Sequence, residues 1–307
     1  MAELELKQAD FEPLQKNEAD AERIGGPSRT FLQDAWRRFK QNKLAMFGIV
    51  VIIILAFLSI FGSMISGHNY YTNDLINANK PPSAEHWFGT DALGRDLFAR
   101  TWYGARISLF IGLMAALLDL VIGVLWGAIS GYFGGKVDEY MMRIADILSG
   151  VPYLLVVILL LVVMGQGLWT LIIAMTITGW INMARIVRGE VMRLRSEEYV
   201  MAARSLGAST SRILKKHLIP NTFGPVLVTL TLSIPTAIFT EAFLSYLGLG
   251  VPAPKASWGT MTSDALPALQ YLPYQLFFPA FFICLTMLAF NIIGDGLRDA
   301  LDPKERK

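Results

Sequence analysis

Six apolar segments divide this chain of 307 residues. Each holds about 17 to 27 residues, close to the roughly 20 that an α-helix needs to cross about 30 Å of hydrocarbon. Pro152, Pro235 and Pro279 fall inside three of the segments, which is tolerated where neighbouring helices satisfy the freed carbonyl groups. The sequence therefore predicts an all-α integral membrane protein with about six transmembrane helices, at 44–66, 107–133, 147–164, 168–184, 223–249 and 274–293.

The composition agrees with a membrane location. Hydrophobic residues make up 53% of the chain and charged residues only 17%, whereas a soluble domain usually carries about 25% charged residues. The excess apolar surface is expected to face lipid. The first forty or so residues are polar, which argues against a cleaved signal peptide.

The basic residues predict the orientation of the spans. Lys and Arg are enriched in cytoplasmic segments of membrane proteins. With the N-terminus placed inside, 22 of the 27 Lys and Arg residues fall in cytoplasmic segments. We therefore expect a multi-pass protein with both termini in the cytoplasm. The main expected cytoplasmic segments are 1–43, 185–222 and 297–307, and a shorter inner segment holds Lys136 and Arg143. The main outer loops are 67–105 and 250–273.

Two different segments precede the first span. Residues 1–28 are acidic and polar and end in Gly and Pro, which predicts a disordered cytoplasmic tail. Residues 29–43 place Phe31, Trp36 and Phe39 on one helical face and most of the basic residues elsewhere. This pattern predicts an amphipathic helix in the inner membrane interface, and an ordinary basic juxtamembrane segment is the alternative. The transmembrane domain then covers 44–296, and 297–307 form a cytoplasmic tail.

Residue types that carry chemistry are scarce. Cys284 is the only cysteine, and His68, His86 and His217 match no metal-ligand spacing. No Gly-x-x-x-x-Gly-Lys-Ser/Thr phosphate loop is present. We therefore expect no catalytic residue, cofactor or metal site in this chain, and no nucleic-acid partner.

The loop at 185–222 has the pattern of a helical hairpin. A short helix at 197–206 ends at Gly207, a Ser/Thr cap follows, and a second short helix is expected to stop before Pro220. Ala202 and Ala203 carry little side chain, so another backbone can come close to the first helix. The hairpin is shaped to enter a groove on a cytoplasmic partner.

This loop resembles the Glu-Ala-Ala loop of the membrane subunits of bacterial ABC importers. Ala202, Ala203, Gly207 and Pro220 match that motif at its spacing, although Met201 stands where the family has Glu. His217 and Ile219 also depart from the general pattern. The loop resembles the peptide/nickel subfamily of these importers in its exact sequence. That sequence is Glu198-Tyr-Val-x-Ala-Ala-Arg204-x-Leu-Gly-Ala, followed by His-x-x-Pro-Asn.

Two further segments resemble the same subfamily, and the resemblance covers about residues 30 to 303. They run from Trp87 to Arg106 and from Glu241 to Gly259. The resemblance implies the second membrane subunit of an oligopeptide or dipeptide importer in a bacterial cell membrane. It also implies a heterodimer with a homologous membrane subunit, two ATPase subunits that use ATP and Mg, and an extracytoplasmic peptide-binding protein. The implied ATPase-coupling residues are Glu198, Ala202, Ala203, Arg204, Gly207 and Pro220.

Two ionisable residues fall inside predicted spans. A charged group costs on the order of 2.5–3.5 kcal/mol at the centre of a bilayer, so Asp119 and Glu241 are expected to face protein or water. Each either belongs to the translocation path or gate, or links helices, with Asn182 or Asn291 as partner. The two interpretations are balanced for Glu241, and the linking role is preferred for Asp119.

Two other patterns have a structural and a functional interpretation. Asp91, Arg95 and Asp96 belong to an outer loop that either docks the binding protein or satisfies its own charges. Glycines also recur every four positions, at Gly123, Gly127, Gly131 and Gly135. Such a stripe of small residues lets helices approach closely. The helix that packs on it belongs either to this chain or to the partner subunit.

Other functions fit the sequence less well. A secondary transporter or channel acting alone is opposed by the loop motif and by the lack of an internal repeat. A membrane scaffold without transport has little support. Within the importer class, nickel or another small solute is the alternative substrate.

Overall fold

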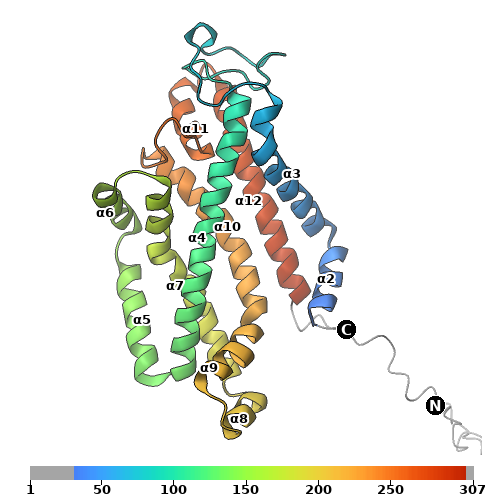
Figure 1. Ribbon diagram of the computed structural model, residues 1–307, viewed down its shortest axis with the longest axis vertical. Coiled ribbons are helices and arrows are strands. Elements are labelled where there is room, and N and C mark those ends of the chain that lie inside the picture. The colour runs from blue at the N-terminus through green and yellow to red at the C-terminus, as the bar shows by residue number, and fades with distance from the viewer. Residues whose placement is uncertain (1–30, 302–307) are drawn as a thin grey trace, which may run out of the picture.

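The computed structural model describes residues 31–301, which are folded almost entirely into helices (Figure 1). Five helices are long and apolar enough to cross a membrane, or six if one bent pair counts as a single span. The all-α membrane fold is therefore confirmed. In the described range the helices are α2 (Phe31–Gln41), α3 (Lys43–Ile65), α4 (Leu97–Phe133), α5 (Gly135–Gly150), α6 (Tyr153–Met164), α7 (Leu168–Leu194), α8 (Glu198–Ser205), α9 (Thr210–Ile213), α10 (Phe223–Tyr246), α11 (Trp258–Ala265) and α12 (Pro273–Leu301), with short helical turns between some of them.

Helix α4 is much longer than its predicted span. It begins at Leu97 because the Asp96 side chain caps it, accepting a hydrogen bond from the Ala99 backbone N–H at 2.7 Å. Its 37 residues correspond to about 55 Å at 1.5 Å per residue. The helix therefore extends well beyond about 30 Å of hydrocarbon and runs through the centre of the molecule (Figure 1).

The prediction of one continuous span at 147–164 is wrong. Helix α5 ends at Gly150, α6 begins at Tyr153, and the two are bent by 83°. Val151 is extended, with φ −80° and ψ 130°, because the ring of Pro152 disfavours helical geometry in the preceding residue. The apolar run thus forms the end of one helix and a second helix of 12 residues.

The prediction that a helix stops before Pro220 is also wrong. Helix α9 continues through a π turn at Leu214–Leu218 and a 3₁₀ turn at Ile219–Thr222 directly into α10. Pro220 has no N–H and cannot complete a regular α-helical pattern. The changed hydrogen-bond register and a bond from the Asn221 side chain to the His217 carbonyl oxygen take up the defect.

The tightest packing joins α4 to α7. A Cβ atom added to Gly123, Gly127 or Gly131 would lie 2.3–2.7 Å from atoms of α7. For Gly127 the nearest atom is the Ala184 carbonyl oxygen, so the two backbones meet with no room for a side chain. The glycine stripe therefore packs within this chain, except that Gly135 faces open space.

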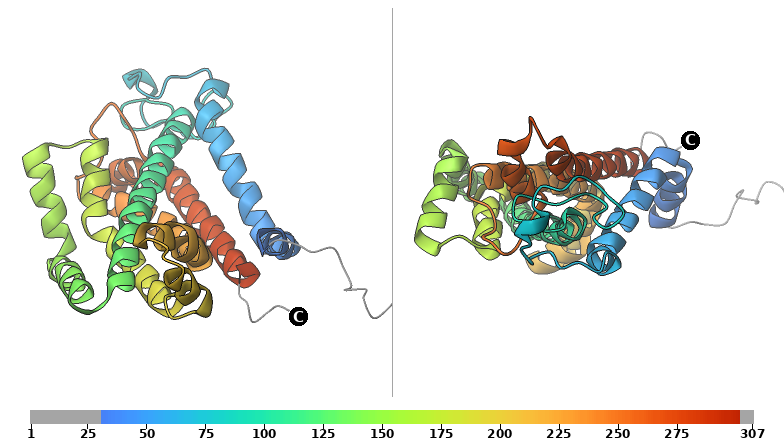
Figure 2. Two further views of the ribbon diagram at one scale, coloured as in Figure 1. Left: turned by 60° about the horizontal axis from the view of Figure 1, so that its bottom comes forward. Right: turned by 90° about the horizontal axis from the view of Figure 1, so that it is seen from above.

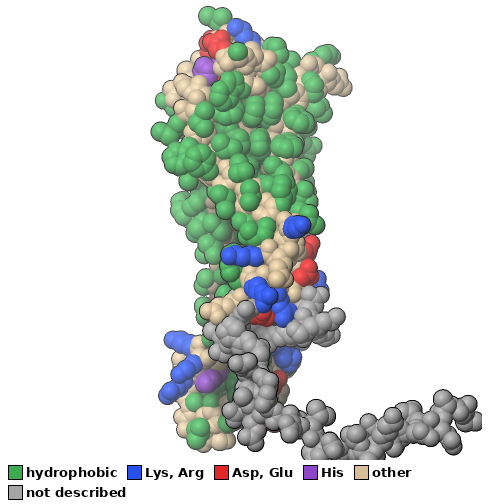
Figure 3. Space-filling view, turned by 90° about the vertical axis from the view of Figure 1, so that its right-hand side faces the viewer, with side chains coloured by type: hydrophobic (Ala, Val, Ile, Leu, Met, Phe, Trp, Pro, Cys, Tyr) green, Lys and Arg blue, Asp and Glu red, His purple; other side chains and the backbone are tan. Residues whose placement is uncertain are grey.

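The two ends of the molecule are built differently. Helices α2, α8 and α9 and the last turn of α12 lie at one end, and the α3–α4 loop and α11 lie at the other (Figures 1 and 2). The face in Figure 3 carries hydrophobic side chains over much of its height, with Lys and Arg gathered towards the end that holds α2. We call these the basic end and the loop end.

Helix α2 forms where an amphipathic helix is predicted, and part of its apolar face packs on this chain. Phe39 and Ala35 are buried, and Phe39 packs with Ala45 and Ala300. Trp36 is half-exposed, with the Lys40 ammonium 5.1 Å from its ring centre. The location of this helix in the membrane interface stays a prediction. The expected tail at 1–28, and most of that at 297–307, lie outside the described residues.

Candidate coupling hairpin and membrane-embedded polar sites

The turn after α8 has the geometry predicted for Gly207. This residue has a φ of +79°, a left-handed conformation that glycine adopts freely. The Gly207 N–H donates to the Arg204 carbonyl at 3.0 Å and the Ala208 N–H donates to the Ala203 carbonyl at 3.0 Å. These two bonds form a Schellman motif, which satisfies carbonyl groups at the helix end. Ser209 then caps α9 by accepting a hydrogen bond from the Arg212 N–H.

Buried side chains hold this hairpin to the spans. Val200 of α8, Ile213 of α9 and Leu218 are fully or almost fully buried against Val187 and Val191 of α7. The position of the hairpin is therefore fixed by apolar contacts with a membrane-spanning helix. A displacement of the hairpin would disturb the packing of α7 directly.

The opposite face of the hairpin exposes apolar groups at the basic end. Leu206 is 88% exposed, and Met201 and Tyr199 are also exposed. Ala202 is exposed beside them and offers little bulk. Apolar side chains presented together at a solvent-facing end mark an interaction surface.

The remaining motif residues of the loop have separate positions. Glu198 lies in the first turn of α8 and is exposed. The Arg204 guanidinium lies 5.5 Å from the ring centre of Tyr132, at the end of α4. Pro220 is exposed within the 3₁₀ turn before α10. The hairpin thus contacts α4 as well as α7.

Glu241 is a fully enclosed link between helices. It has 0% exposure, and its carboxylate accepts hydrogen bonds from Ser257, Ser245 and Ser108 at 2.6, 2.8 and 3.1 Å. Ser108 belongs to α4, Ser245 to α10, and Ser257 caps α11. This geometry fits the linking role, with serines as partners where asparagines were suggested.

Asp119 has the opposite surroundings. It lines a cavity of about 470 Å³ between α4, α7 and α10, together with polar residues of α7 and α10. Its Oδ1 atom is buried without a hydrogen-bond partner among the described residues, and so is the hydroxyl of nearby Tyr153. Asn182 of α7 and Thr236 of α10 line the same cavity and are exposed. Polar groups exposed within spans require protein or water rather than lipid. We call this surface the polar groove.

The charges of the α3–α4 loop are turned inward. Asp91 is buried and pairs with Arg95 at 2.6 Å and with Arg100 at 3.4 Å. Asp96 is 3% exposed, caps α4 and contacts His86. Asp264 of α11 extends the network to Arg100 at 3.5 Å. This arrangement supports the alternative in which the loop satisfies its own charges, because little of Asp91 or Asp96 reaches the surface.

One polar cluster was missed in the sequence. Arg188 of α7 forms a bidentate ion pair with Asp138 of α5, and Ser130 of α4 also donates to that carboxylate. Arg195 donates to the carbonyl groups of Gly131 and Tyr132 at the end of α4. These bonds join three helices at the basic end. The bonds made by Arg188 and Arg195 connect residues 50 or more positions apart, beyond the reach of any local pattern.

The fold is that of a helical membrane-spanning protein with an exposed hairpin at its basic end. The family model described as "Binding-protein-dependent transport system inner membrane component" matches residues 123–307. A second, described as the N-terminal TM domain of oligopeptide transport permease C, matches residues 30–82. The chain belongs to the family of binding-protein-dependent transport system inner membrane components.

Relatives along the whole chain agree. The oligopeptide transport system permease protein OppC of Bacillus subtilis is 65% identical over 97% of both chains. The dipeptide transport system permease protein DppC of the same species is 56% identical over 95% of this chain and 92% of the relative. OppC of Escherichia coli K12 is 43% identical over 93% and 95%.

A solved structure shares the fold. A chain of the inward-facing MetNI methionine ABC transporter aligns with a TM-score of 0.53 and 17% identity. The alignment covers 67% of the present chain and 96% of the MetNI chain. The fold is therefore shared with a chain of an ABC transporter. The family and the relatives above make this chain a permease subunit of a binding-protein-dependent transport system.

Proposed function

We propose that this chain forms half of the translocation pathway of an ATP-driven importer for oligopeptides or dipeptides. The observation that carries the proposal is the hairpin α8–α9, whose exposed face suits a partner groove and whose buried face packs on α7. The relatives named above are called oligopeptide and dipeptide permeases, which favours peptides over nickel or another small solute.

The proposed assembly follows from what this chain lacks. No phosphate loop occurs in the sequence, so ATP and Mg are used by two cytoplasmic ATPase subunits that bind the hairpin. A homologous second membrane subunit completes the pathway, and an extracytoplasmic binding protein delivers the peptide. The chain itself is not an enzyme. It resides in the bacterial cell membrane with the basic end in the cytoplasm.

The proposed path in this chain is the polar groove. Asp119, Asn182 and Thr236 present polar atoms there within the spans. Apolar surface beside them would bind lipid, whereas a polar cavity needs water or the second membrane subunit. We assign Asp119 to the path and Glu241 to the support of the helices around it.

Gly207→Val tests the coupling role of the hairpin. A Cβ at Gly207 would meet no atom within 4 Å, so the cost arises from the left-handed backbone alone, about 1–3 kcal/mol. The spans should still insert, and ATP-driven peptide uptake by the reconstituted complex should fall at least tenfold. Ala202→Lys should act in the same direction through bulk and charge on the exposed face, without touching the turn.

Gly207→Asn is the matched control, because asparagine tolerates the left-handed conformation better than valine. It should retain most of the uptake. Uptake should also require the ATPase subunits, and this chain alone should not hydrolyse ATP. Normal ATP-coupled uptake by a well-expressed Gly207→Val complex would refute the proposed role of the hairpin.

A further inference from the structure

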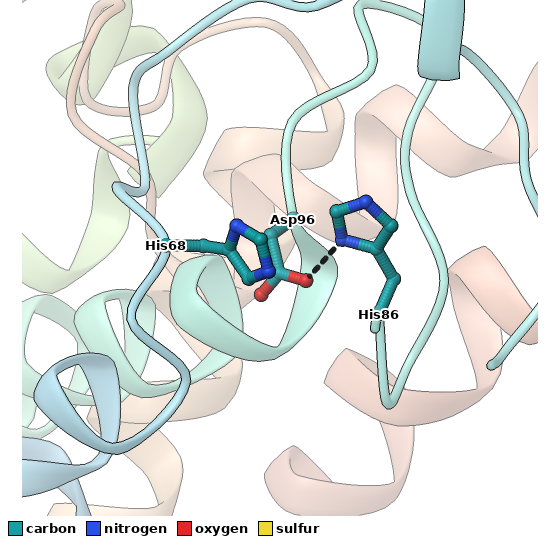
Figure 4. Close-up of side chains that lie close together, drawn as sticks. All are labelled: His68, His86 and Asp96. Atoms are coloured by element: carbon teal, nitrogen blue, oxygen red, sulfur yellow. Dashed lines mark hydrogen bonds and ion pairs between the residues drawn. The ribbon is translucent and has the colours of Figure 1, made fainter. Parts of the chain in front are cut away.

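Two histidines and an aspartate meet in the α3–α4 loop at the loop end of the molecule (Figure 4). His68 lies just after α3, His86 lies further along the loop, and Asp96 is the N-cap of α4. One ligand atom from each lies within 4.8 Å of the other two. The spacings of 18 and 10 residues match no known ligand pattern, so the sequence did not reveal this cluster.

The geometry directs both imidazole rings towards one carboxylate. The His86 Nδ1 atom lies 2.9 Å from Asp96 Oδ2, and the two imidazole rings are 4.7 Å apart at 33°. His86 and Asp96 are almost completely buried. The His86 Nε2 atom has no hydrogen-bond partner in the described part of the chain, so Asp96 is the polar contact that orients this ring.

Each of the three candidate metal-ligating residues is held in place by other hydrogen bonds. Asp96 Oδ1 accepts from the Ala99 N–H at 2.7 Å and leaves Oδ2 for the cluster. The His68 Nε2 atom lies 3.1 Å from the Glu85 carbonyl oxygen. The His86 backbone N–H donates a hydrogen bond to the Ser83 hydroxyl oxygen at 3.1 Å. A preorganised set of donors loses little conformational freedom when it binds an ion.

The donor set selects the kind of ion. Two imidazole nitrogens and one carboxylate oxygen suit Zn²⁺ and similar divalent transition metals. Ca²⁺ and Mg²⁺ prefer sites built mainly from oxygen ligands. A hydrogen bond between His86 and Asp96 would by itself account for two of the three side chains. The position of the His68 ring against the same carboxylate supplies the third donor.

We propose that His68, His86 and Asp96 bind one divalent transition-metal ion of the zinc class, with a coordination position left open. The ion fastens the end of α3 to the start of α4 and to the loop between them. His68 is partly exposed, which gives the ion a route from solvent. This inference stands on the local geometry and does not depend on the proposed transport function.

Zn²⁺ binding to the full-length protein in detergent tests the site. Titration against a chromophoric zinc chelator should give one Zn²⁺ per chain, and Zn²⁺ should raise the unfolding temperature. His68→Gln keeps a donor for the Glu85 carbonyl, and Asp96→Asn keeps an N-cap side chain. Each should weaken Zn²⁺ binding by at least about tenfold.

His217→Gln is the matched control, because the third histidine of the chain lies in the π turn at the opposite end. It should leave Zn²⁺ binding and the Zn²⁺-induced rise in unfolding temperature unchanged. If Asp96→Asn fails to fold, His68→Gln decides, since His68 is partly exposed. Absence of stoichiometric Zn²⁺ binding, or equal binding by His68→Gln, would overturn the proposal.

Discussion

Two carboxylates inside the spans differ in what surrounds them, and this difference assigns their roles. Glu241 accepts three serine hydroxyl bonds and has no exposed surface. Asp119 leaves Oδ1 without a partner beside a polar groove. A buried charge survives only when its hydrogen bonds are made. The three bonds therefore support a structural role for Glu241, and we assign Asp119, whose Oδ1 makes no such bond, to the polar groove.

Glu241→Gln should lower stability, because one carboxylate acceptor becomes an NH₂ group facing serine hydroxyls. The expected loss is about 1–3 kcal/mol of unfolding free energy, the cost of disturbing buried bonds to a charged group. Thermal unfolding in detergent should show a lower midpoint, and the yield of assembled complex should fall with it. Uptake per assembled complex should stay near that of the native chain.

Two comparisons make this result specific. Glu139→Gln changes an exposed carboxylate at the start of α5 and should leave the midpoint unchanged. Asp119→Asn changes a carboxyl group whose Oδ1 has no bond to lose, so it should alter uptake per complex without lowering the midpoint. A changed uptake in Glu241→Gln at normal stability would instead place Glu241 in the path or gate.

At the scale of elements, helices were predictable where apolar length and caps agree. The spans at 44–66 and 223–249 were predicted within a few residues of α3 and α10. The left-handed turn at Gly207 was also predictable, because glycine followed by a Ser/Thr cap is a local signal. These features depend on neighbours in the sequence, and sequence reasoning found them.

The features that were predicted wrongly or missed depend on contacts that the local sequence pattern does not contain. Pro152 breaks one apolar run into α5 and α6, whereas Pro235 lies within the continuous α10. Pro220 lies in a 3₁₀ turn that follows a π turn and leads directly into α10. Proline chemistry is the same in all three, so the packing around each one decides the outcome. The serine partners of Glu241 and the histidine cluster join distant segments, which periodicity does not connect.

The contact between α4 and α7 gives a prediction at this scale. Gly127→Ala would place a methyl group 2.3 Å from the Ala184 carbonyl oxygen, so the helices must separate. Overpacking of this kind costs typically about 1–3 kcal/mol, and thermal unfolding should show a clearly lower midpoint.

Gly189→Ala is the control, because it should change the unfolding midpoint in the opposite direction or leave it unchanged. Gly189 lies in α7, the other helix of this contact, but a Cβ there meets no atom within 4 Å. Alanine is the better helix former by roughly 0.5–1 kcal/mol, so the midpoint should rise or stay level. Equal effects of the two substitutions would show that close approach of α4 and α7 does not limit stability.

For the whole molecule, the two ends and the exposed apolar surface between them suggest how it sits in a bilayer. Within their most apolar windows, α3 and α12 are only 22% buried by this chain, whereas α7 is 61% buried. The outer helices therefore offer surface to lipid or to another subunit, and α7 is the most enclosed of the candidate spans. The basic end carries α2, the hairpin and the last turn of α12 (Figure 1).

The charge asymmetry predicts which end faces the cytoplasm. Since 22 of the 27 Lys and Arg residues fall in the segments expected inside, the basic end should be cytoplasmic. Single cysteines in a Cys284→Ser background can locate each end. Thr72 and Ser211 are both exposed, at the loop end and in the hairpin respectively. A membrane-impermeant maleimide should label Thr72→Cys in intact cells, and should label Ser211→Cys only after the membrane is permeabilised. Labelling of Ser211→Cys in intact cells would reverse the orientation, and with it the assignment of the hairpin to cytoplasmic ATPases.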